Sequence, residues 1–296
     1  MRCTVLPNDF DYVLASSSRF IPQAPFVIYK GLVALFFVFW CIRWPLVDYY
    51  SIYLFVTYWA FYTGALYFLV SFVTACGRLG KGGAKPHTSE YAASPAYEDA
   101  VPMPRAWRCR ASLERRLFGV QMVAWNISCV GSLVVATVFW LSLYHGDSLT
   151  SVDINAHIFF AVIMLIDQML VATRFRLRDL WVAELFSVTY LAFNITWYCT
   201  APNGMKLIYS VLDWSLMPAE AAAYSAAVLL LLIPLFGVVH FGVFRLREFL
   251  YAACQRRVAS PPASLSDHLL AVGSGGSQQN LGISPQLQAG TGYVDV

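Results

Sequence analysis

The sequence predicts an all-α polytopic membrane protein, a bundle of six transmembrane helices with both termini in the cytoplasm. Three observations predict this fold class. Of the 296 residues, 58% are hydrophobic and only 12% are charged, whereas about a quarter of the residues of an ordinary soluble domain are charged. The hydrophobic residues gather into runs near the ~20 residues that a helix needs to cross a bilayer. Most of the basic residues fall between those runs, on one side of the expected bundle.

Six runs are long enough to cross a membrane as helices. They cover, approximately, residues 26–43, 51–76, 117–144, 152–173, 180–200 and 219–244. Of the 20 basic residues, 18 fall on one face of the bundle, and they include Lys30, which we assign to the N-terminal tail. Only Arg43 and Lys206 fall on the other face. Cytoplasmic loops carry an excess of Lys and Arg, so an even number of spans places both termini in the cytoplasm.

The bundle covers residues 26–250 and contains one long connection, 77–111, whose Gly, Pro and polar residues predict a flexible cytoplasmic loop. Residues 1–25 are expected to form a cytoplasmic tail, and residues 251–296 a disordered cytoplasmic tail. We expect the protein in the plasma membrane or the endoplasmic reticulum, with membrane lipids as its partners. The net charge of +3 is too small to indicate a nucleic-acid partner.

Five polar side chains are predicted to gather in the outer third of the membrane. At 1.5 Å per helical residue, Thr57, His157 and Asn194 share a depth of roughly 9 Å on three different spans. Asp153 lies one turn from His157 on the same helical face, and Asp213 in the outer connection can reach the same region. Ionisable residues inside a membrane are rare and often functional, so this outer layer is the candidate site.

A second polar group is predicted in the inner half of the bundle. Asp167 and Glu184 lie near the inner ends of their spans, and Arg174, Arg176 and Arg178 lie in the short connection below them. Arginine side chains in such a place can extend toward the two carboxylates. We interpret this group as a structural ion-pair network between the fourth and fifth spans. It lies about 15 Å from the outer histidine along the helix, so the two layers are separate sites.

The residues of the outer layer also have simpler interpretations. A threonine in a membrane helix commonly bonds the carbonyl four residues before it, which for Thr57 is that of Tyr53. A single intramembrane histidine is more often a hydrogen-bonded structural group than a catalyst. Thr57 also begins a stripe of small residues that predicts close helix packing. The stripe contains Thr57, Ala60, Gly64, Ser71 and Thr74.

We expect neither a cofactor nor a metal ion. The seven cysteines form no CxxC pair. Haem ligation by two histidines requires both at matching depth on facing helices. His157 is near the outer end of its span and His240 is near the inner end of its own, so the two cannot bind one haem.

Four stretches of the sequence resemble, in their order and spacing, the rolling stone proteins, and through them the wider family of androgen-induced and androgen-dependent membrane proteins. The resemblance covers about residues 26–250. The stretches are "YLFVTYW" (53–59), "ATVFWLSLY" (136–144), "AHIFFAVIMLID" (156–167) and "IYSVLDW" (208–214).

Some members of that wider family are multi-pass threonine hydrolases that cleave fatty acid esters of hydroxy fatty acids. The resemblance implies Thr57, in "FVT", as the nucleophile, His157 as the catalytic histidine and Asp167 as the acid ten residues later. The rolling stone branch is instead associated with myoblast fusion. The sequence departs from the family pattern at Ser210, where proline is expected, and at residues 158–160, which are bulkier than expected after the histidine.

The functional hypothesis is an intramembrane hydrolase of lipid esters, within the carboxylic ester hydrolases. Thr57 would attack the ester carbonyl and His157 would remove the hydroxyl proton, a task that suits an imidazole at neutral pH. Asp153 or Asp213 would orient the imidazole, and Asn194 would donate to the oxyanion. Long acyl chains would enter laterally from the lipid.

The competing hypothesis is a non-catalytic membrane protein that acts in cell fusion, adhesion or scaffolding. It predicts that Thr57→Ala leaves function intact, while changes in the outer loops (145–151 and 201–218) or in the tails abolish it. Those outer loops are short, which argues mildly against a large adhesive ectodomain. A transporter is a third hypothesis, but no charged path connects the two polar layers.

Overall fold

The computed structural model describes residues 16–18, 20–47, 51–79, 105–144, 146, 149–202 and 207–259. Regular structure in these residues is helical, apart from one isolated pairing between Ser18 and Val171. The chain divides into two units, Met1–Tyr251 and Ala252–Val296, and the bundle described below belongs to the first.

The described helices comprise long α-helices and short segments of one or two turns. The long elements are α2 (Gln23–Val47), α3 (Val56–Leu79), α4 (Arg105–Val138), α6 (Phe160–Leu170), α7 (Trp181–Thr200), α8 (Pro218–Ala227) and α9 (Ile233–Ala259). The short elements are η1 (Ser51–Leu54), η2 (Phe139–Leu143), α5 (Ser151–Ile154), η3 (Asn155–Phe159), η4 (Leu177–Leu180), η5 (Ser210–Leu212) and η6 (Val228–Leu232). Three of the short elements, η2, η3 and η6, are π-helical.

Five of the described helical segments are long and apolar enough to cross a membrane. They are Gln23–Leu46, Val56–Leu79, Arg116–Leu143, Ser151–Leu170 and Pro218–Arg256. Each overlaps a predicted span, in agreement with an all-α, membrane-embedded fold. α7 coincides with the predicted span 180–200, but its hydroxyl and amide side chains lower its hydropathy and it is not among the five. Six spans and two cytoplasmic termini therefore stay predictions.

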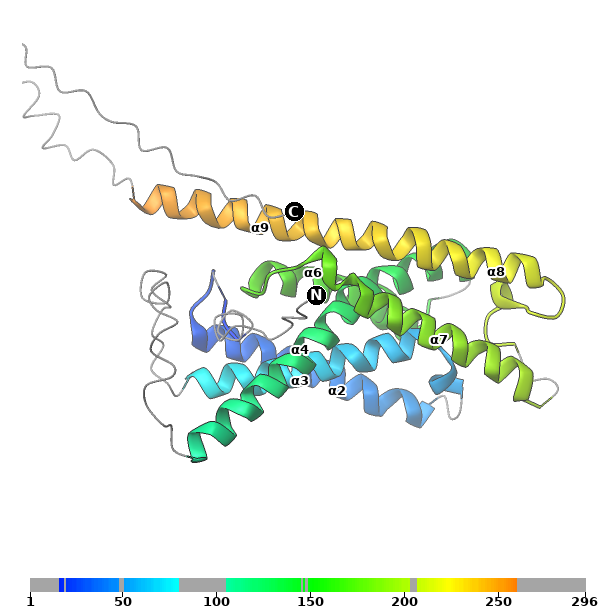
Figure 1. The fold of residues 1–296 in the computed structure, drawn as a ribbon, viewed down its shortest axis with the longest axis horizontal. Coiled ribbons are helices and arrows are strands. Elements are labelled where there is room, and N and C mark those ends of the chain that lie inside the picture. The colour runs from blue at the N-terminus through cyan, green and yellow to red at the C-terminus, as the bar shows by residue number, and fades with distance from the viewer. Residues whose placement is uncertain are drawn as a thin grey trace, which may run out of the picture. The chain divides into compact units, whose positions relative to one another are not determined.

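α3 is the helix around which the first half of the bundle packs. It makes its most extensive contacts with α2 and α4, and Figure 1 shows it in cyan alongside both. The predicted stripe lies in these contacts, since Ala60, Gly64, Ser71 and Thr74 are all buried. At Gly64 an added Cβ would lie only 2.9 Å from the ring of Phe160. The stripe therefore permits close helix packing, as predicted.

The second connection of the bundle is shorter than predicted. α3 continues to Leu79, and α4 begins at Arg105, inside the expected loop at 77–111. The first turns of α4 are rich in Ala, Leu, Arg and Glu, which are strong helix formers. Residues 80–104, for which flexibility was predicted, lie outside the described residues.

α8, η6 and α9 follow one another as one continuous rod, coloured yellow to orange in Figure 1. The rod continues to Ala259, past the predicted start of the C-terminal tail at residue 251. The residues predicted to be disordered beyond it, 260–296, lie outside the described residues.

Part of the predicted N-terminal tail packs against the bundle. The hydroxyl of Ser18 donates to the carbonyl of Leu170 at 2.6 Å, and the N–H of Ala172 donates to the carbonyl of Ser17 at 3.0 Å. These bonds lie at the end of α6, where carbonyl groups have no partner within the helix. Residues 1–15 of the predicted tail lie outside the described residues.

Candidate functional site

A mainly apolar cavity opens where α3 begins, and it joins segments from both halves of the bundle. Its empty space is about 730 Å³, open solvent included. The walls come from α3, α4, α7, α8, three π-helical segments and the connection between α7 and α8. The polar lining residues are Thr57, His157, Ser187, Tyr190, Tyr209, Tyr224 and Ser225, and every other lining residue is a valine or a leucine. Two of the predicted site residues, Thr57 and His157, therefore line one cavity.

The three π-helical segments all border this cavity. η2 contributes Leu143, η3 contributes His157, and η6 contributes Val228 and Leu229. A π-turn inserts one extra residue into a helix and is frequent at functional sites. The deviations from regular helix thus concentrate at the candidate site.

Thr57 differs from four other helical threonines of the bundle. Hydroxyl groups that donate to the carbonyl four residues earlier, at 2.7–2.8 Å, belong to Thr63, Thr189, Thr196 and Thr200. α3 begins at Val56, so Thr57 lies in its first turn. The carbonyl of Tyr53 accepts from the indole of Trp59 at 2.8 Å instead. Among the described residues, Thr57 has its hydrogen bond with Tyr209 and none with the Tyr53 carbonyl, in contrast to the simpler interpretation.

The hydroxyl of Thr57 forms a hydrogen bond with the hydroxyl of Tyr209. The Tyr209 oxygen also accepts from the N–H of Val56 at 3.1 Å. Beside it, Tyr190 donates to the carbonyl of Leu54 at 2.7 Å. Tyr209 is only 8% exposed, and burial raises its pKa to about 12, so its hydroxyl keeps its proton at neutral pH. The start of α3 is thus held by two tyrosines from distant segments.

His157 is held by stacking rather than by a carboxylate. Its ring lies parallel to that of Phe139, with 3.8 Å between the ring centroids and 5° between the planes. The residue is 8% exposed, and its Nδ1 has no hydrogen-bond partner among the described residues. Most buried polar atoms are hydrogen-bonded, so an unpartnered one calls for a reason. His157 itself lines the cavity.

Asp153 does not orient His157 through a hydrogen bond. Its carboxylate accepts from the N–H of Thr150 at 3.0 Å and from the Thr150 hydroxyl at 2.7 Å. This reciprocal arrangement is a capping box, which satisfies the free N–H groups at the start of α5. Asp153 is absent from the cavity lining. Its role in the structure is therefore at the helix end.

Asn194 and Asp213 also lie outside the cavity lining. The side-chain oxygen of Asn194 accepts from the indole N–H of Trp214 at 2.9 Å. Asp213 accepts from the N–H and hydroxyl of Ser215 at 2.9 and 2.6 Å, and from the N–H of Leu216 at 3.0 Å. These bonds hold the pKa of Asp213 below its ordinary value, and the bond from the Ser215 hydroxyl has the largest effect. Both residues shape the connection that carries Tyr209.

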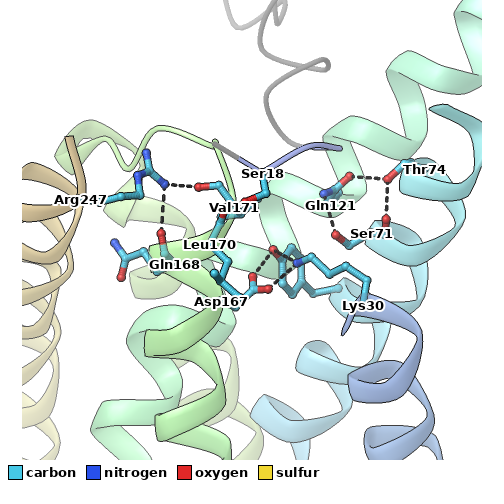
Figure 2. Close-up of polar contacts among 11 residues, drawn as sticks. Ser18, Lys30, Ser71, Thr74, Gln121, Asp167, Gln168, Leu170, Val171 and Arg247 are labelled. Atoms are coloured by element: carbon cyan, nitrogen blue, oxygen red, sulfur yellow. Dashed lines mark hydrogen bonds and ion pairs between the residues drawn. The ribbon is translucent and has the colours of Figure 1, made fainter. Parts of the chain in front are cut away.

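The inner half of the bundle contains a separate polar group around Asp167, shown in Figure 2. Lys30 donates to one carboxylate oxygen and Tyr67 to the other, both at 2.5 Å. The Lys30 and Asp167 side chains are both fully buried. The predicted pairing of Asp167 with Glu184 and the arginines is therefore wrong. Lys30 lies inside α2 rather than in the N-terminal tail, and it faces α6 across the bundle.

The other residues of the predicted inner network do not take part in this buried pair. Glu184 is half-buried on α7. Arg178 lies 3.6 Å from its neighbour Asp179 and is 69% exposed, so the pair contributes little to stability. Arg174 is exposed and Arg176 is half-buried in the segment before η4. These four residues therefore lie at or near the protein surface.

Arg247 joins α9 to the end of α6, as Figure 2 shows. Its guanidinium is fully buried and donates to the carbonyls of Gln168 at 3.0 Å, of Thr173 at 2.9 Å and of Val171. These carbonyls lie at a helix C-terminus, where partners within the helix are missing. About two turns earlier on α9, His240 contacts the side chain of Gln168 at 2.5 Å. The inner layer is thus a brace between α2, α3, α6 and α9.

Sequence reasoning missed Tyr190, Tyr209 and Phe139. The sequence does contain a pointer to Tyr209, because this residue lies in the stretch "IYSVLDW" that carries the family resemblance. Ser210, which replaces the expected proline, follows it directly and is exposed at the start of η5. Phe139 has the same kind of pointer, because it lies in the stretch "ATVFWLSLY". Tyr190 has none, because an aromatic residue in an apolar helix is ordinary.

The cavity combines a hydroxyl group, an imidazole with a free nitrogen and apolar walls. Among the described residues, no three His, Cys, Asp or Glu side chains lie close enough together to hold a metal ion. A hydroxyl and an imidazole are the groups that acyl-transfer chemistry uses. The apolar walls suit a ligand with hydrocarbon chains.

Comparison with known proteins places the chain in a family. Searches among curated proteins and among solved structures found no match. The family model described as protein rolling stone matches residues 109–265, more than half of the chain. The match includes His157 and Tyr209, and it leaves α3, with Thr57, outside. Its extent, together with the order of the apolar helices, shows that this chain belongs to the rolling stone family.

Proposed function

We propose that the cavity at the start of α3 hydrolyses lipid esters, with Thr57 as the nucleophile and His157 as the general base. One observation carries this proposal: the two residues come from distant helices and line the same apolar cavity, where Nδ1 of His157 is buried without a partner. A threonine hydroxyl is a weak nucleophile until a base removes its proton. The free nitrogen is a group that can accept that proton.

The proposed reaction has two halves. The Oγ–H bond of Thr57 breaks as Oγ attacks the ester carbonyl carbon, and the proton passes to His157. The tetrahedral intermediate then loses its alcohol group, which takes the proton from His157 and leaves an acyl-threonine. In the second half, water attacks the acyl-threonine and gives a proton to His157, which returns it to Oγ of Thr57. One water is consumed, and one acid and one alcohol are released.

The apolar walls support a substrate with long acyl chains, and the resemblance to hydrolases of fatty acid esters of hydroxy fatty acids supports that ester class. Valine and leucine side chains from six helical segments surround the two reacting groups. Burial of each CH₂ group of a chain contributes ~0.8 kcal/mol. An ester with two hydrocarbon arms would therefore bind more tightly than a short soluble ester.

Purified protein in lipid nanodiscs tests the proposal. Wild-type protein should hydrolyse a long-chain ester and react covalently with a fluorophosphonate probe, while Thr57→Ala and His157→Ala should do neither. Thr63→Ala is the matched control, because Thr63 lies on the same helix and bonds the carbonyl of Trp59; it should behave as wild type. Equal probe labelling of wild type and Thr57→Ala would contradict the proposal and favour a non-catalytic role in fusion, adhesion or scaffolding.

We also propose six spans, with α7 as the fifth and both termini in the cytoplasm of the plasma membrane or endoplasmic reticulum. The 20 residues of α7 give about 30 Å of helix, enough to cross a bilayer. Five spans would instead place the two basic ends of the chain on opposite faces, against the usual distribution of Lys and Arg. Reporter tags at each terminus should both be inaccessible in intact cells and accessible once the plasma membrane alone is permeabilised. A tag that is accessible in intact cells, or that stays inaccessible after this permeabilisation, would support five spans.

A further inference from the structure

The hydroxyl of Tyr209 lies at the start of α3, among the groups that surround the candidate nucleophile. It accepts from the N–H of Val56 at 3.1 Å and forms a hydrogen bond with the hydroxyl of Thr57. Both Tyr209 and Thr57 line the cavity.

The position of this hydroxyl is fixed by its surroundings. The Tyr209 ring packs edge to face against Phe55, with 5.3 Å between the centroids and 79° between the planes. Tyr209 is 8% exposed. A buried ring held on one side by an aromatic contact and at its tip by a backbone N–H has little freedom to move. The hydroxyl is thus a rigid partner for a neighbouring side chain.

Thr57 needs such a partner. Its hydroxyl has no bond to the carbonyl four residues before it in the described part of the chain, and that carbonyl accepts from the indole of Trp59. The bond to Tyr209 therefore decides where the Thr57 hydroxyl points. A nucleophile misplaced by 1 Å costs a reaction about 100-fold in rate, so the group that orients the hydroxyl controls its reactivity.

We propose that Tyr209 is the positioning residue of the Thr57 nucleophile, and that it holds the hydroxyl toward the cavity from a segment outside the helices. The inference rests on the proposed hydrolase function. Tyr209 keeps its own proton throughout, while the proton of Thr57 passes to His157. Once Oγ of Thr57 has lost that proton, the phenolic O–H can turn to donate to the negative oxygen, which stabilises it.

The test compares Tyr209→Phe with Tyr62→Phe in the purified full-length protein. Tyr209→Phe removes the hydroxyl and keeps the ring, whereas Tyr62 lies on α3 outside the cavity lining and stacks on Tyr53. Probe labelling and kcat should fall about 100-fold in Tyr209→Phe, with KM changed less than about twofold. Tyr62→Phe should keep wild-type rates.

Two further measurements separate positioning from a structural role and from base catalysis. Thermal unfolding of each variant in detergent shows whether it is folded, and rates are taken well below the lower midpoint. The pH dependence of kcat/KM should keep its midpoint in Tyr209→Phe, because Tyr209 does not titrate in the reaction. A shifted midpoint would overturn positioning in favour of a direct proton-transfer role.

The outcomes distinguish this inference from the function on which it rests. Wild-type labelling in Tyr209→Phe, with no labelling in Thr57→Ala, would overturn the inference and leave the hydrolase proposal standing. Equal labelling of wild type and Thr57→Ala would overturn both. A loss of labelling in Tyr209→Phe that follows its unfolding curve at every temperature would show a structural role and also overturn the inference.

Discussion

Lys30 and Asp167 are 137 positions apart in the sequence and form an ion pair of 2.5 Å in which both side chains are fully buried. Aromatic rings surround the cation, with Tyr67 at 4.6 Å and Phe68 at 5.0 Å from the ammonium to the ring centroids. The pair joins the first and fourth of the predicted spans. It lies where neither water nor lipid headgroups can replace a lost partner.

Removal of one partner of this pair should destabilise the protein strongly. Lys30→Met leaves a buried carboxylate unpaired, and Asp167→Leu leaves a buried ammonium unpaired. Each change should lower the free energy of unfolding by ~3–5 kcal/mol. The double variant should lose much less than the sum, because it leaves no unpaired charge. Denaturant unfolding in detergent measures all four proteins. Additive losses would show that the two side chains do not interact.

Gly64 should tolerate no larger residue. A Cβ there would lie 2.9 Å from the ring of Phe160 and 3.1 Å from that of Phe37. Gly64→Ala should therefore destabilise the bundle by ~1–3 kcal/mol, the usual cost of overpacking. Gly119→Ala on α4 is the matched control, because an added Cβ meets nothing within 4 Å. It should raise stability by up to ~1 kcal/mol through helix propensity. Equal thermal midpoints for the two variants would contradict the packing at Gly64.

A bulky side chain in the cavity wall should block the proposed reaction without unfolding the protein. Leu191→Trp places an indole in the cavity from α7, and ester hydrolysis should fall at least ~10-fold because the acyl chain loses its space. Leu185→Trp, on the same helix, is the control. Leu185 is 56% exposed and outside the lining, so hydrolysis should be unaffected. Full activity in Leu191→Trp would place substrate binding elsewhere.

The turn at Asp213 should loosen in acid. Its pKa is lowered in the folded protein by hydrogen bonds from Ser215 and Leu216. The stabilisation is therefore present above the unfolded pKa of ~3.9 and is lost as the pH falls through the lower folded pKa. Hydrogen exchange at Ser215 and Leu216, corrected for intrinsic rates, should quicken below that pH. Asp213→Asn does not titrate, so its exchange should show no such step; an identical step in that variant would assign the effect to another group.

The sequence predicted where the long apolar helices lie because hydrophobic length is a local property. It also predicted that Thr57 and His157 share a depth, since depth follows from helical rise along each span. It could not predict which side chain meets Asp167, because the place of Lys30 at the start of an apolar run assigns it to the N-terminal tail. The pairing depends on how helices rotate and pack, and periodicity within one helix does not contain that information. The same limit hid Tyr209, whose place depends on how an irregular connection folds.

The π-turn η3 contains His157 and precedes Asp167 on a single continuous helical segment, Ser151–Leu170. It takes up one residue more than an α-helical turn would need. Deletion of one residue from the regular helix of α6 before Asp167 would rotate everything beyond it by about 100°, and the carboxylate would swing away from Lys30. Deletion of one residue within η3 would instead restore a regular helix and leave Asp167 facing Lys30. The π-turn therefore lets the outer cavity change its shape by one residue while the inner ion pair stays intact.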